Sequence, residues 1–340
     1  EKGEGEAGEQ RIRMSSKSVA VVGVTGAVGQ EMLDVLAARD FPLSNLRPLA
    51  SERSAGKTVQ FRGEEIPIEV LGDDSFAGVD LALFSAGASI SREYAPVAVD
   101  AGAVVVDNSS AFRMDPAIPL VVPEVNSDAI AAHQGIIANP NCSTIIMVVA
   151  LQPIHELSAL TRVVVSTYQA ASGAGAKGMD ALRRELSGEE LEDSPFPHRL
   201  AGNLVPRIDV VQDNGYTKEE MKMVLETRKI MGLEGVPISA TCVRVPVERA
   251  HSESIQVSTE SPLELEAVRA AFEAAPGLQV IDEPAADLYP TPLQAAGQDD
   301  VYVGRLRRHP DEDETCDFWV VGDQIRKGAA LNTIQIAEEL

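Results

Sequence analysis

The chain opens with a short apolar strand, a glycine-rich turn and an amphipathic helix, and this order strongly restricts the possible folds. Residues 18–23 read SVAVVG, a β-branched run typical of a strand that is buried on both faces. Apolar residues then recur at helical spacing through 28–36, and a second apolar run follows at 46–50. A strand, a helix and a second strand in this order begin a doubly wound parallel sheet. We therefore predict an α/β chain with an N-terminal Rossmann-like domain.

The turn between that strand and helix has the chemistry of a phosphate-binding loop. Three glycines at G-x-x-G-x-x-G spacing permit a tight turn and let backbone N–H groups approach a pyrophosphate, while the helix N-terminus adds positive potential. The common dinucleotide motif is G-x-G-x-x-G, so a glycine-rich connection without a ligand is the alternative interpretation. We expect cofactor binding by the residues Gly23, Thr25, Gly26, Ala27, Val28 and Gly29.

The end of the second strand bears on which nicotinamide cofactor is used. An NAD enzyme usually places a carboxylate there for the ribose 2′-OH. Here Ser51, Arg53 and Ser54 could bind a 2′-phosphate, although the neighbouring Glu52 weakens the argument. We interpret this segment as favouring NADP(H). The rest of the cofactor groove is assigned to the residues after a later strand, Ser85 and Gly87.

The pattern along the rest of the chain predicts a second domain of a different type. In the first half, further strand-like runs occupy 66–70, 79–85, 103–107 and 136–139, with helices at 92–100 and 144–157. From 161–169 onward, strand-like runs alternate apolar and polar residues, as a strand with one covered face does. Similar runs lie at 243–247, 254–259 and 318–321, with helices at 178–186, 218–231, 262–273 and 328–339. This pattern predicts a largely antiparallel sheet with helices on one side.

These elements suggest the following domain boundaries. Residues 1–17 form a Glu- and Gly-rich tail, and 18–139 form the NADP-binding domain, which the C-terminal segment 323–340 completes. The catalytic and dimerisation domain comprises 140–322.

Composition limits the possible partners and compartments. The 340 residues contain 29 basic and 52 acidic side chains, a net charge of −23, which repels nucleic acid and anionic membranes. We expect neither as a partner. The simple explanation of this charge is solubility, and adaptation to high salt is the other. Three cysteines without regular spacing argue against a disulfide framework or a metal site and favour a reducing, cytoplasmic location, with organelle import as the alternative.

Cys142 is the candidate nucleophile. It lies in the segment NPNCST, directly before a strongly apolar helix, where Asn141 is a favourable N-cap residue. The helix dipole and free N–H groups stabilise a thiolate in the first turn, so we expect a lowered thiol pKa. A lone cysteine is usually only a small hydrophobic residue, and we assign that structural role to Cys242 and Cys316.

A thiolate nucleophile needs a proton-transfer group and a means of orienting the substrate. His251 is a candidate acid or base, although a single histidine is more often structural. Arg244, seven residues earlier and on or near the same strand, suits a substrate carboxylate because its guanidinium binds in a bidentate manner. Gln169, at the end of another strand, could orient an acyl group.

Taken together, these motifs resemble the aspartate-semialdehyde dehydrogenase family. The segments GVTGAVG, NPNCST, QAASGAG, EEMK and CVRVPVERAHSE occur here in the order typical of that family, and the likeness extends from about Ser18 to the end. One departure is Ala250 before the histidine, where the family often has Gly, Ser or Cys. The resemblance implies a second domain like that of glyceraldehyde-phosphate dehydrogenase, and a homodimer or homotetramer.

The resemblance also implies a role for each matching residue. Cys142 would be the nucleophile, His251 the general acid and base, Gln169 the orienting group, and Arg244 the ligand of the substrate α-carboxylate. Glu219 would bind the substrate amino group, although Glu219 and Lys222 could equally be a surface pair at i, i+3. The phosphate would be bound by Arg113, Asn141 and Lys222, and the nicotinamide would lie near Ser172, Gly173 and Gln324.

The activity implied is the reversible, NADPH-dependent reductive dephosphorylation of 4-phospho-L-aspartate to L-aspartate 4-semialdehyde and phosphate. That reaction belongs to the synthesis of lysine (through diaminopimelate), threonine, methionine and isoleucine. N-Acetyl-glutamyl-phosphate reductase is the nearest rival, because it shares the chemistry but needs no site for a free amino group. An acyl-CoA reductase and an NADP-binding redox sensor are more distant alternatives.

Overall fold

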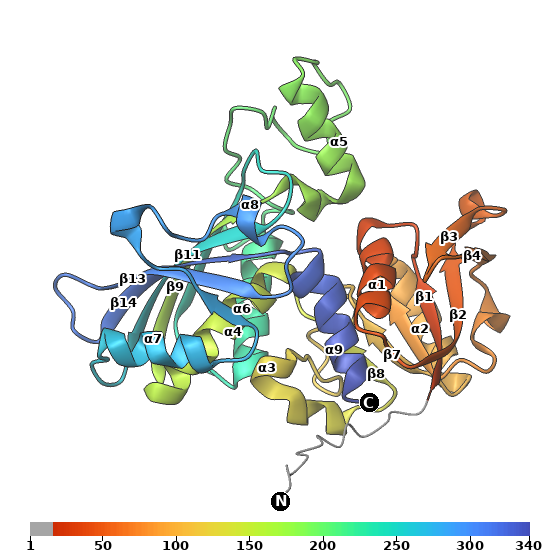
Figure 1. The fold of residues 1–340 in the computed structure, drawn as a ribbon, viewed down its shortest axis with the longest axis horizontal. Coiled ribbons are helices and arrows are strands. Elements are labelled where there is room, and N and C mark those ends of the chain that lie inside the picture. The colour runs from red at the N-terminus through yellow and green to blue at the C-terminus, as the bar shows by residue number, and fades with distance from the viewer. Residues whose placement is uncertain (1–15) are drawn as a thin grey trace, which may run out of the picture.

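The computed structural model describes residues 16–340, so the predicted tail lies almost entirely outside the described residues. Lys17, assigned to the tail from sequence, is in fact the first residue of a strand. Two six-stranded sheets stand side by side, with the C-terminal helix between them (Figure 1). No helix within 16–340 is long and apolar enough to cross a membrane.

The first sheet is doubly wound, as predicted, and all its strand pairs are parallel. In spatial order its strands are β5 (Glu69–Val70), β2 (Leu43–Ala50), β1 (Lys17–Val22), β6 (Leu81–Phe84), β7 (Val104–Asp107) and β8 (Ile136–Ala138). Alternate residues of β1 face opposite layers. Val19 and Val21 pack in the layer of α1 (Ala27–Ala38) and the C-terminal α9 (Asn332–Glu338), whereas Ala20 and Val22 pack in that of α2 (Ala88–Asp100).

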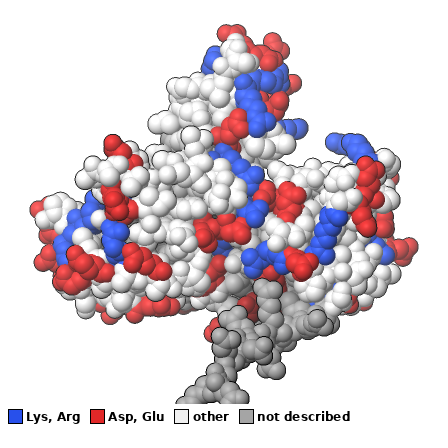
Figure 2. All heavy atoms as spheres, viewed as in Figure 1, with Lys and Arg blue, Asp and Glu red and all other residues white. Residues whose placement is uncertain are grey.

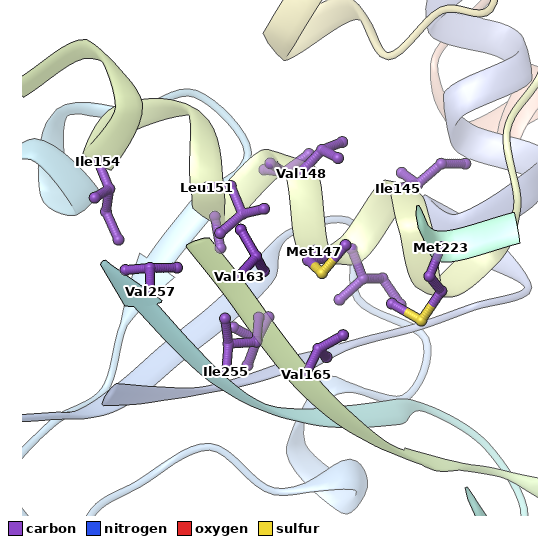
Figure 3. Close-up of a cluster of buried hydrophobic side chains, with 14 of the residues drawn as sticks. Ile145, Met147, Val148, Leu151, Ile154, Val163, Val165, Met223, Ile255 and Val257 are labelled. Atoms are coloured by element: carbon purple, nitrogen blue, oxygen red, sulfur yellow. The ribbon is translucent and has the colours of Figure 1, made fainter. Parts of the chain in front are cut away.

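The second sheet is mixed, with antiparallel strands in the centre and one parallel pair at each edge. Its order is β10 (Ile238–Arg244), β9 (Leu160–Gln169), β11 (His251–Thr259), β14 (Thr315–Gly322), β13 (Val301–Arg308) and β12 (Leu278–Val280). One face packs on α4 (Cys142–Leu157), α6 (Lys218–Met231) and α7 (Leu265–Ala274). Figure 3 shows α4 side chains directed at Val163, Val165, Ile255 and Val257 of this sheet.

The smaller elements lie around the two sheets. They are the hairpin β3 (Thr58–Phe61) and β4 (Glu64–Pro67), with α3 (Pro123–Asn126), α5 (Gly175–Leu186) and α8 (Pro292–Ala295). On the face shown in Figure 2, acidic and basic side chains are interspersed. Arg249 and Arg326, near the C-terminal segment, both pair with Glu31 of α1, at 2.8 and 3.0 Å. These ion pairs join the two halves of the molecule.

Several predicted elements differ from the observed ones, and the reasons are local. The strand predicted at 243–247 ends at Arg244, because Pro246 has no N–H to donate to a sheet. The strand predicted at 66–70 is divided at Pro67 between β4 and β5, which belong to different sheets. The strands β3, β12 and β13 were not predicted. The final helix begins with a π-helical turn, Arg326–Leu331, rather than at Gly328.

The apolar layer beneath the second sheet contains one carboxyl group without a partner. Glu253, on β11, is fully buried, and among the described residues neither of its carboxyl oxygens has a hydrogen-bond partner. Its strand neighbour across the sheet is Thr167, and Ile255 and Val257 continue the same face. Burial raises the pKa of Glu253 well above its ordinary value, so the folded protein favours the neutral acid.

We predict that Glu253 makes the protein less stable as the pH rises. Folding raises the pKa of Glu253, so its full contribution to stability is present below the pKa that it has in the unfolded chain. Between the unfolded-state and folded-state pKa values this contribution falls by about 1.4 kcal/mol per pH unit. Glu253→Gln removes this titration. Urea unfolding of both proteins from pH 5 to pH 8 should show the variant losing less stability over that interval. Parallel losses would contradict the prediction.

Candidate active site

A cleft of about 570 Å³ lies between the two halves and is lined by loops from both. It brings together most of the residues predicted from sequence. Those that line it are Gly26, Ala27, Val28, Ser85, Arg113, Asn141, Cys142, Gln169, Ser172, Gly173, Glu219, Lys222, Arg244 and Gln324. Residues separated by almost 300 positions along the chain therefore share one site.

The other predicted residues lie outside this lining. Gly23 and Gly29 shape the loop behind the cleft, and His251 is buried behind Gln169. Thr25 and Gly87 are exposed. In the turn after β2, Ser51 and Arg53 are exposed and Ser54 is buried.

The loop after β1 is built for close approach of a ligand to its backbone. Gly23 has φ +83°, and a Cβ there would lie 2.9 Å from the backbone of Ser85 and Ala86. A Cβ on Gly29 would lie 2.4 Å from the Gly23 carbonyl oxygen. Gly26 precedes α1 without a side-chain cap, so the first N–H groups of the helix are left for a ligand. These features fit a dinucleotide pyrophosphate.

The candidate nucleophile lies at the start of a helix that Asn141 caps, and this cap is as predicted. Its side-chain oxygen accepts hydrogen bonds from the N–H groups of Ser143 and Thr144, at 3.1 and 3.2 Å. Cys142 is therefore the first residue of α4 and is partly exposed to the cleft. Cys242 and Cys316 are buried free thiols, which fits the structural role predicted for them.

The expected lowering of the Cys142 pKa is wrong for this structure. Burial and the Glu219 carboxylate raise the pKa to about 12, although Arg113, Arg244 and Lys222 act in the opposite direction. The sequence indicated the helix start but not the depth of the thiol or the nearby carboxylate. This environment favours the neutral thiol over the thiolate.

His251 is fully buried, and the backbone fixes its tautomer. The Ala170 N–H donates to Nδ1 at 3.0 Å, so the neutral ring carries its proton on Nε2, 3.4 Å from the Gln169 side-chain nitrogen. Burial, and then the charge of Arg244, hold the pKa of His251 well below its ordinary value. In this state Nε2–H and the Gln169 NH₂ group are both donors, so no hydrogen bond joins them. To accept a proton at Nε2 it must adopt the other tautomer and lose the Ala170 bond.

Arg244 and His251 come from different strands, which corrects the prediction that they lie on or near the same one. Arg244 ends β10, His251 begins β11, and β9 lies between them. The two meet at Gly173, where a Cβ would lie 2.6 Å from an Arg244 nitrogen and 3.3 Å from His251 Nε2. Arg244 is buried and donates to the Ala170 carbonyl at 2.6 Å, and no carboxylate within 16–340 forms a salt bridge with it.

Glu219 connects the other polar groups of the cleft. One carboxylate oxygen accepts from the side chains of Asn141 at 3.0 Å and Gln169 at 3.2 Å, and the other accepts from Lys222 at 2.9 Å. Burial alone would raise the pKa of Glu219, but Lys222 and the two amides outweigh it and leave the pKa below its ordinary value. Lys222 also donates to Asp209 at 3.0 Å. Glu219 and Lys222 are thus part of the site, not only a surface pair.

Arg113 has one donor without a partner. Its Nη2 donates to the Asn108 carbonyl at 2.9 Å and its Nη1 contacts Glu226 at 3.2 Å, while its buried Nε has no partner among the described residues. A buried, unpartnered guanidinium N–H beside Lys222 suits an oxyanion. Asn108 and Glu226 were not predicted from sequence, because their contacts depend on segments far apart in the chain.

The segment after β14 packs against Cys142 and bonds to the residues around it. Gln324 accepts from the Ala250 N–H at 2.9 Å and donates to the Ser172 hydroxyl. Ala250 has φ +73°, a conformation that favours glycine, which explains why glycine is suited to the position before the histidine. Gly328 lies against Cys142, because a Cβ there would be 2.9 Å from the Cys142 Cβ.

Comparison with known proteins finds relatives along nearly the whole chain. A family model for the NAD binding domain of semialdehyde dehydrogenases matches residues 18–133, and one for their dimerisation domain matches 151–327. The aspartate-semialdehyde dehydrogenase of Synechocystis is 51% identical over 95% of this chain and 96% of its own length. That of Aquifex aeolicus is 52% identical over 95% and 97%. The chain belongs to the aspartate-semialdehyde dehydrogenase family.

Solved structures of the family have the same fold. Aspartate semialdehyde dehydrogenase II of Vibrio cholerae, described as complexed with ASA, has a TM-score of 0.93 and 46% identity, over 96% of this chain and 98% of that one. The Candida albicans enzyme, described with NADP, has a TM-score of 0.73 and 26% identity, over 96% and 98%. An aspartate-semialdehyde dehydrogenase acts on a small molecule, and the dimerisation-domain match indicates an oligomer.

We predict that Gly328→Ala lowers turnover at least tenfold, about 1.4 kcal/mol in the activation barrier. The added methyl group would lie 2.9 Å from the Cys142 Cβ and 3.2 Å from its Cα, so the start of α4 must shift. The measurement is kcat, together with the rate at which iodoacetamide alkylates Cys142. Gly72→Ala is the control, because that position is extended (φ −159°) and has no atom within 4 Å of a Cβ. Wild-type kcat in Gly328→Ala would refute the packing argument.

Proposed function

We propose that this chain catalyses the reaction L-aspartate 4-semialdehyde + phosphate + NADP⁺ ⇌ 4-phospho-L-aspartate + NADPH + H⁺, in the synthesis of lysine, threonine, methionine and isoleucine. The observation that carries the proposal is the position of Cys142 in the cleft. The same cleft is lined by Arg244, a buried guanidinium without a carboxylate partner among the described residues, and by the basic residues Arg113 and Lys222, and all three act on the Cys142 thiol. An acyl phosphate of an amino acid has one anionic group for each of these regions.

Each proposed role follows from a contact. Arg244 binds the substrate α-carboxylate: its Nη1 donates to the Ala170 carbonyl, but its Nε–Nη2 edge has no hydrogen-bond partner among the described residues and can pair in a bidentate manner. Glu219, ionised through Lys222 and two amides, binds the α-amino group. Arg113, Lys222 and Asn141 bind the phosphate. Gln169 orients the acyl group, since Glu219 and the Thr167 hydroxyl fix both ends of its amide.

In the biosynthetic direction, Cys142 sulfur attacks the acyl carbon, the bond to the phosphate oxygen breaks, and phosphate leaves with that electron pair. The Sγ proton passes to His251 Nε2 in the tautomer that has released Ala170. When bound, NADPH supplies a hydride to the thioester carbon. The resulting thiohemiacetal then loses its C–S bond, giving the aldehyde, and the sulfur regains a proton. Covalent catalysis divides one difficult reduction into easier steps.

The charge that develops on the carbonyl oxygen needs preorganised donors. The Cys142 N–H, in the first turn of α4, has no intrahelical partner and is one candidate. His251 Nε2–H, in the tautomer observed here, is another donor near Gly173. A neutral, buried imidazole is suited to this task because donating a hydrogen bond does not require the costly charged form.

The cofactor proposal rests on the loop after β1 and on the turn after β2. Gly23, Gly26 and Gly29 would hold the pyrophosphate, and Ser172, Gly173 and Gln324 would lie beside the nicotinamide. Arg53 is exposed and has no hydrogen-bond or salt-bridge partner within 16–340, so its guanidinium is available to a 2′-phosphate. Ser51 supplies a neighbouring exposed hydroxyl.

The assembly and the domain boundaries are also proposals. A homodimer or a homotetramer is supported by the face of the second sheet opposite α4, where Tyr168 and Trp319 are only partly buried and their rings lie 5.3 Å apart. We retain the domain boundaries 18–139 and 140–322, with 323–340 returning to the first sheet. A cytoplasmic location is supported by three free cysteines, which suit a reducing compartment.

The test is phosphate-dependent reduction of NADP⁺ by L-aspartate semialdehyde, followed at 340 nm, with N-acetyl-glutamate semialdehyde as the parallel substrate. We expect activity with the first substrate only, and none in Cys142→Ser, which should still bind NADPH because Cys142 is the nucleophile and not a cofactor ligand. Activity with the acetylated substrate alone would overturn the role of Glu219. Activity retained in Cys142→Ser would overturn the covalent mechanism.

Arg53→Leu tests the choice of NADP over NAD. A hydrogen bond to a charged group contributes about 1.5–3 kcal/mol, so KM for NADP⁺ should rise roughly tenfold or more, while KM for NAD⁺ changes little. Lys57→Met, which removes a neighbouring exposed charge, is the matched control. Equal effects of Arg53→Leu on both cofactors would exclude Arg53 from the 2′-phosphate site.

A further inference from the structure

Helix α6 carries a row of four charged residues on one face, and the proposed reaction uses only half of it. Glu219, Lys222, Glu226 and Lys229 follow each other at intervals of three, four and three residues, so they lie on one side of the helix. The first two line the cleft, where the proposed reaction assigns them to the substrate. The second two lie further along and bind a loop that comes from the other half of the molecule.

Glu226 joins the two parts of the proposed phosphate site. Its side chain is 2% exposed. One oxygen contacts Arg113 Nη1 at 3.2 Å, and the other accepts from the Asn141 N–H at 2.6 Å. A single buried carboxylate thus holds the guanidinium that faces the cleft and the backbone that leads into Cys142. Burial raises the pKa of Glu226, and Arg113 opposes this effect.

Lys229 holds the loop that carries Arg113. Its ammonium donates to the carbonyl oxygens of Arg113, Asp115 and Ile118, at 2.8, 2.7 and 2.8 Å. An ammonium has three protons, and all three are used here. The loop follows β7 of the first sheet, whereas α6 packs on the second sheet. Lys229 therefore fixes the position of a first-sheet loop relative to the helix that supplies Lys222.

We propose that Glu226 and Lys229 are positioning residues for phosphate, acting through Arg113 and the turn before Cys142. This inference rests on the proposed function. Arg113 has a long, flexible side chain, and holding its guanidinium in place avoids a loss of side-chain entropy when phosphate binds. Glu226 and Asn108 each engage one N–H of the two Nη groups, so the unpartnered Nε–H and the second N–H of each Nη group remain for an oxyanion.

The experiment measures phosphate binding without turnover, as protection of Cys142 from iodoacetamide by inorganic phosphate in the full-length protein. In Lys229→Met the loop loses three hydrogen bonds, and we expect the phosphate Kd to rise at least tenfold while NADP⁺ binding is unchanged. Lys218→Met is the matched control, since Lys218 is exposed on the same helix and its side chain has no hydrogen bond among the described residues. It removes the same charge without releasing the loop.

Glu226→Gln is the second variant, and it keeps the shape of the side chain. Its amide oxygen can still accept from Asn141, but its NH₂ group would face the Arg113 donors, so the phosphate Kd should again rise at least tenfold. Glu220→Gln is its control. Glu220 is a buried carboxylate of the same helix that accepts only from the backbone N–H groups of Thr217 and Cys242, and its replacement should leave the phosphate Kd unchanged.

The outcomes separate this inference from the proposed function. If the wild-type protein shows no protection by phosphate, both fail. If phosphate protects the wild type and both variants equally, only the positioning role fails. A Kd raised as much in Lys218→Met as in Lys229→Met would mean that net charge, not the position of the loop, controls phosphate binding, and would also overturn the inference.

Discussion

The position of the Asn141 backbone and side chain determines most of the site. Its N–H donates to Glu226, its amide NH₂ donates to Glu219, and its amide oxygen caps α4 through Ser143 and Thr144. A helix start needs such a cap because its first N–H groups have no partner within the helix. Here the cap also connects the candidate nucleophile to two buried carboxylates of α6, Glu219 and Glu226. The turn before Cys142, the proposed phosphate ligand Arg113 and the proposed amino-group ligand Glu219 are therefore held in one hydrogen-bonded unit.

The electrostatics of the cleft differ from those of the chain as a whole. A protein with a net charge of −23 keeps Arg113, Arg244 and Lys222 around one thiol, which provides an anion site on an otherwise acidic molecule. Yet burial, and then Glu219, outweigh these cations and raise the pKa of Cys142, whereas burial, and then Arg244, lower the pKa of His251. Burial therefore favours the neutral form of both the thiol and the imidazole. In the proposed mechanism the Cys142 thiol must therefore lose its proton when substrate binds or during the attack itself.

Local sequence patterns predicted the fold and the cleft well, because they depend on near neighbours. The glycine loop, the Asn141 cap and helix 218–231 were recognised from short segments, and the fold class is confirmed. Interactions between distant segments were not predictable. The sequence shows Glu226 and Lys229 only as charged positions on a helix. Their contacts with Asn141 and the 113–118 loop join segments that lie about 85 and more than 110 residues apart in the chain. The predicted direction of the Cys142 pKa shift was wrong for the same reason, because burial of the thiol depends on tertiary structure.

The C-terminal segment explains how two sheets with separate cores form one site. Gln324 bonds Ala250 and Ser172 at the candidate nicotinamide position, and four residues later Gly328 lies against Cys142. Between them, Lys327 is buried and donates to Glu124, Asn332 and Gln335, at 2.6, 2.9 and 2.7 Å. A buried ammonium is tolerated only with such full pairing, so the segment has little freedom to move.

The π-helical geometry of 326–331 follows from these constraints. The turn must place Gly328 against Cys142 while directing Lys327 towards Glu124 and leading into α9, which packs on the first sheet. A π-helical turn inserts an extra residue and so changes which side chains share a face, and such turns occur frequently at functional sites. The same short segment thereby completes the core of the first domain and forms the wall behind the nucleophile of the second.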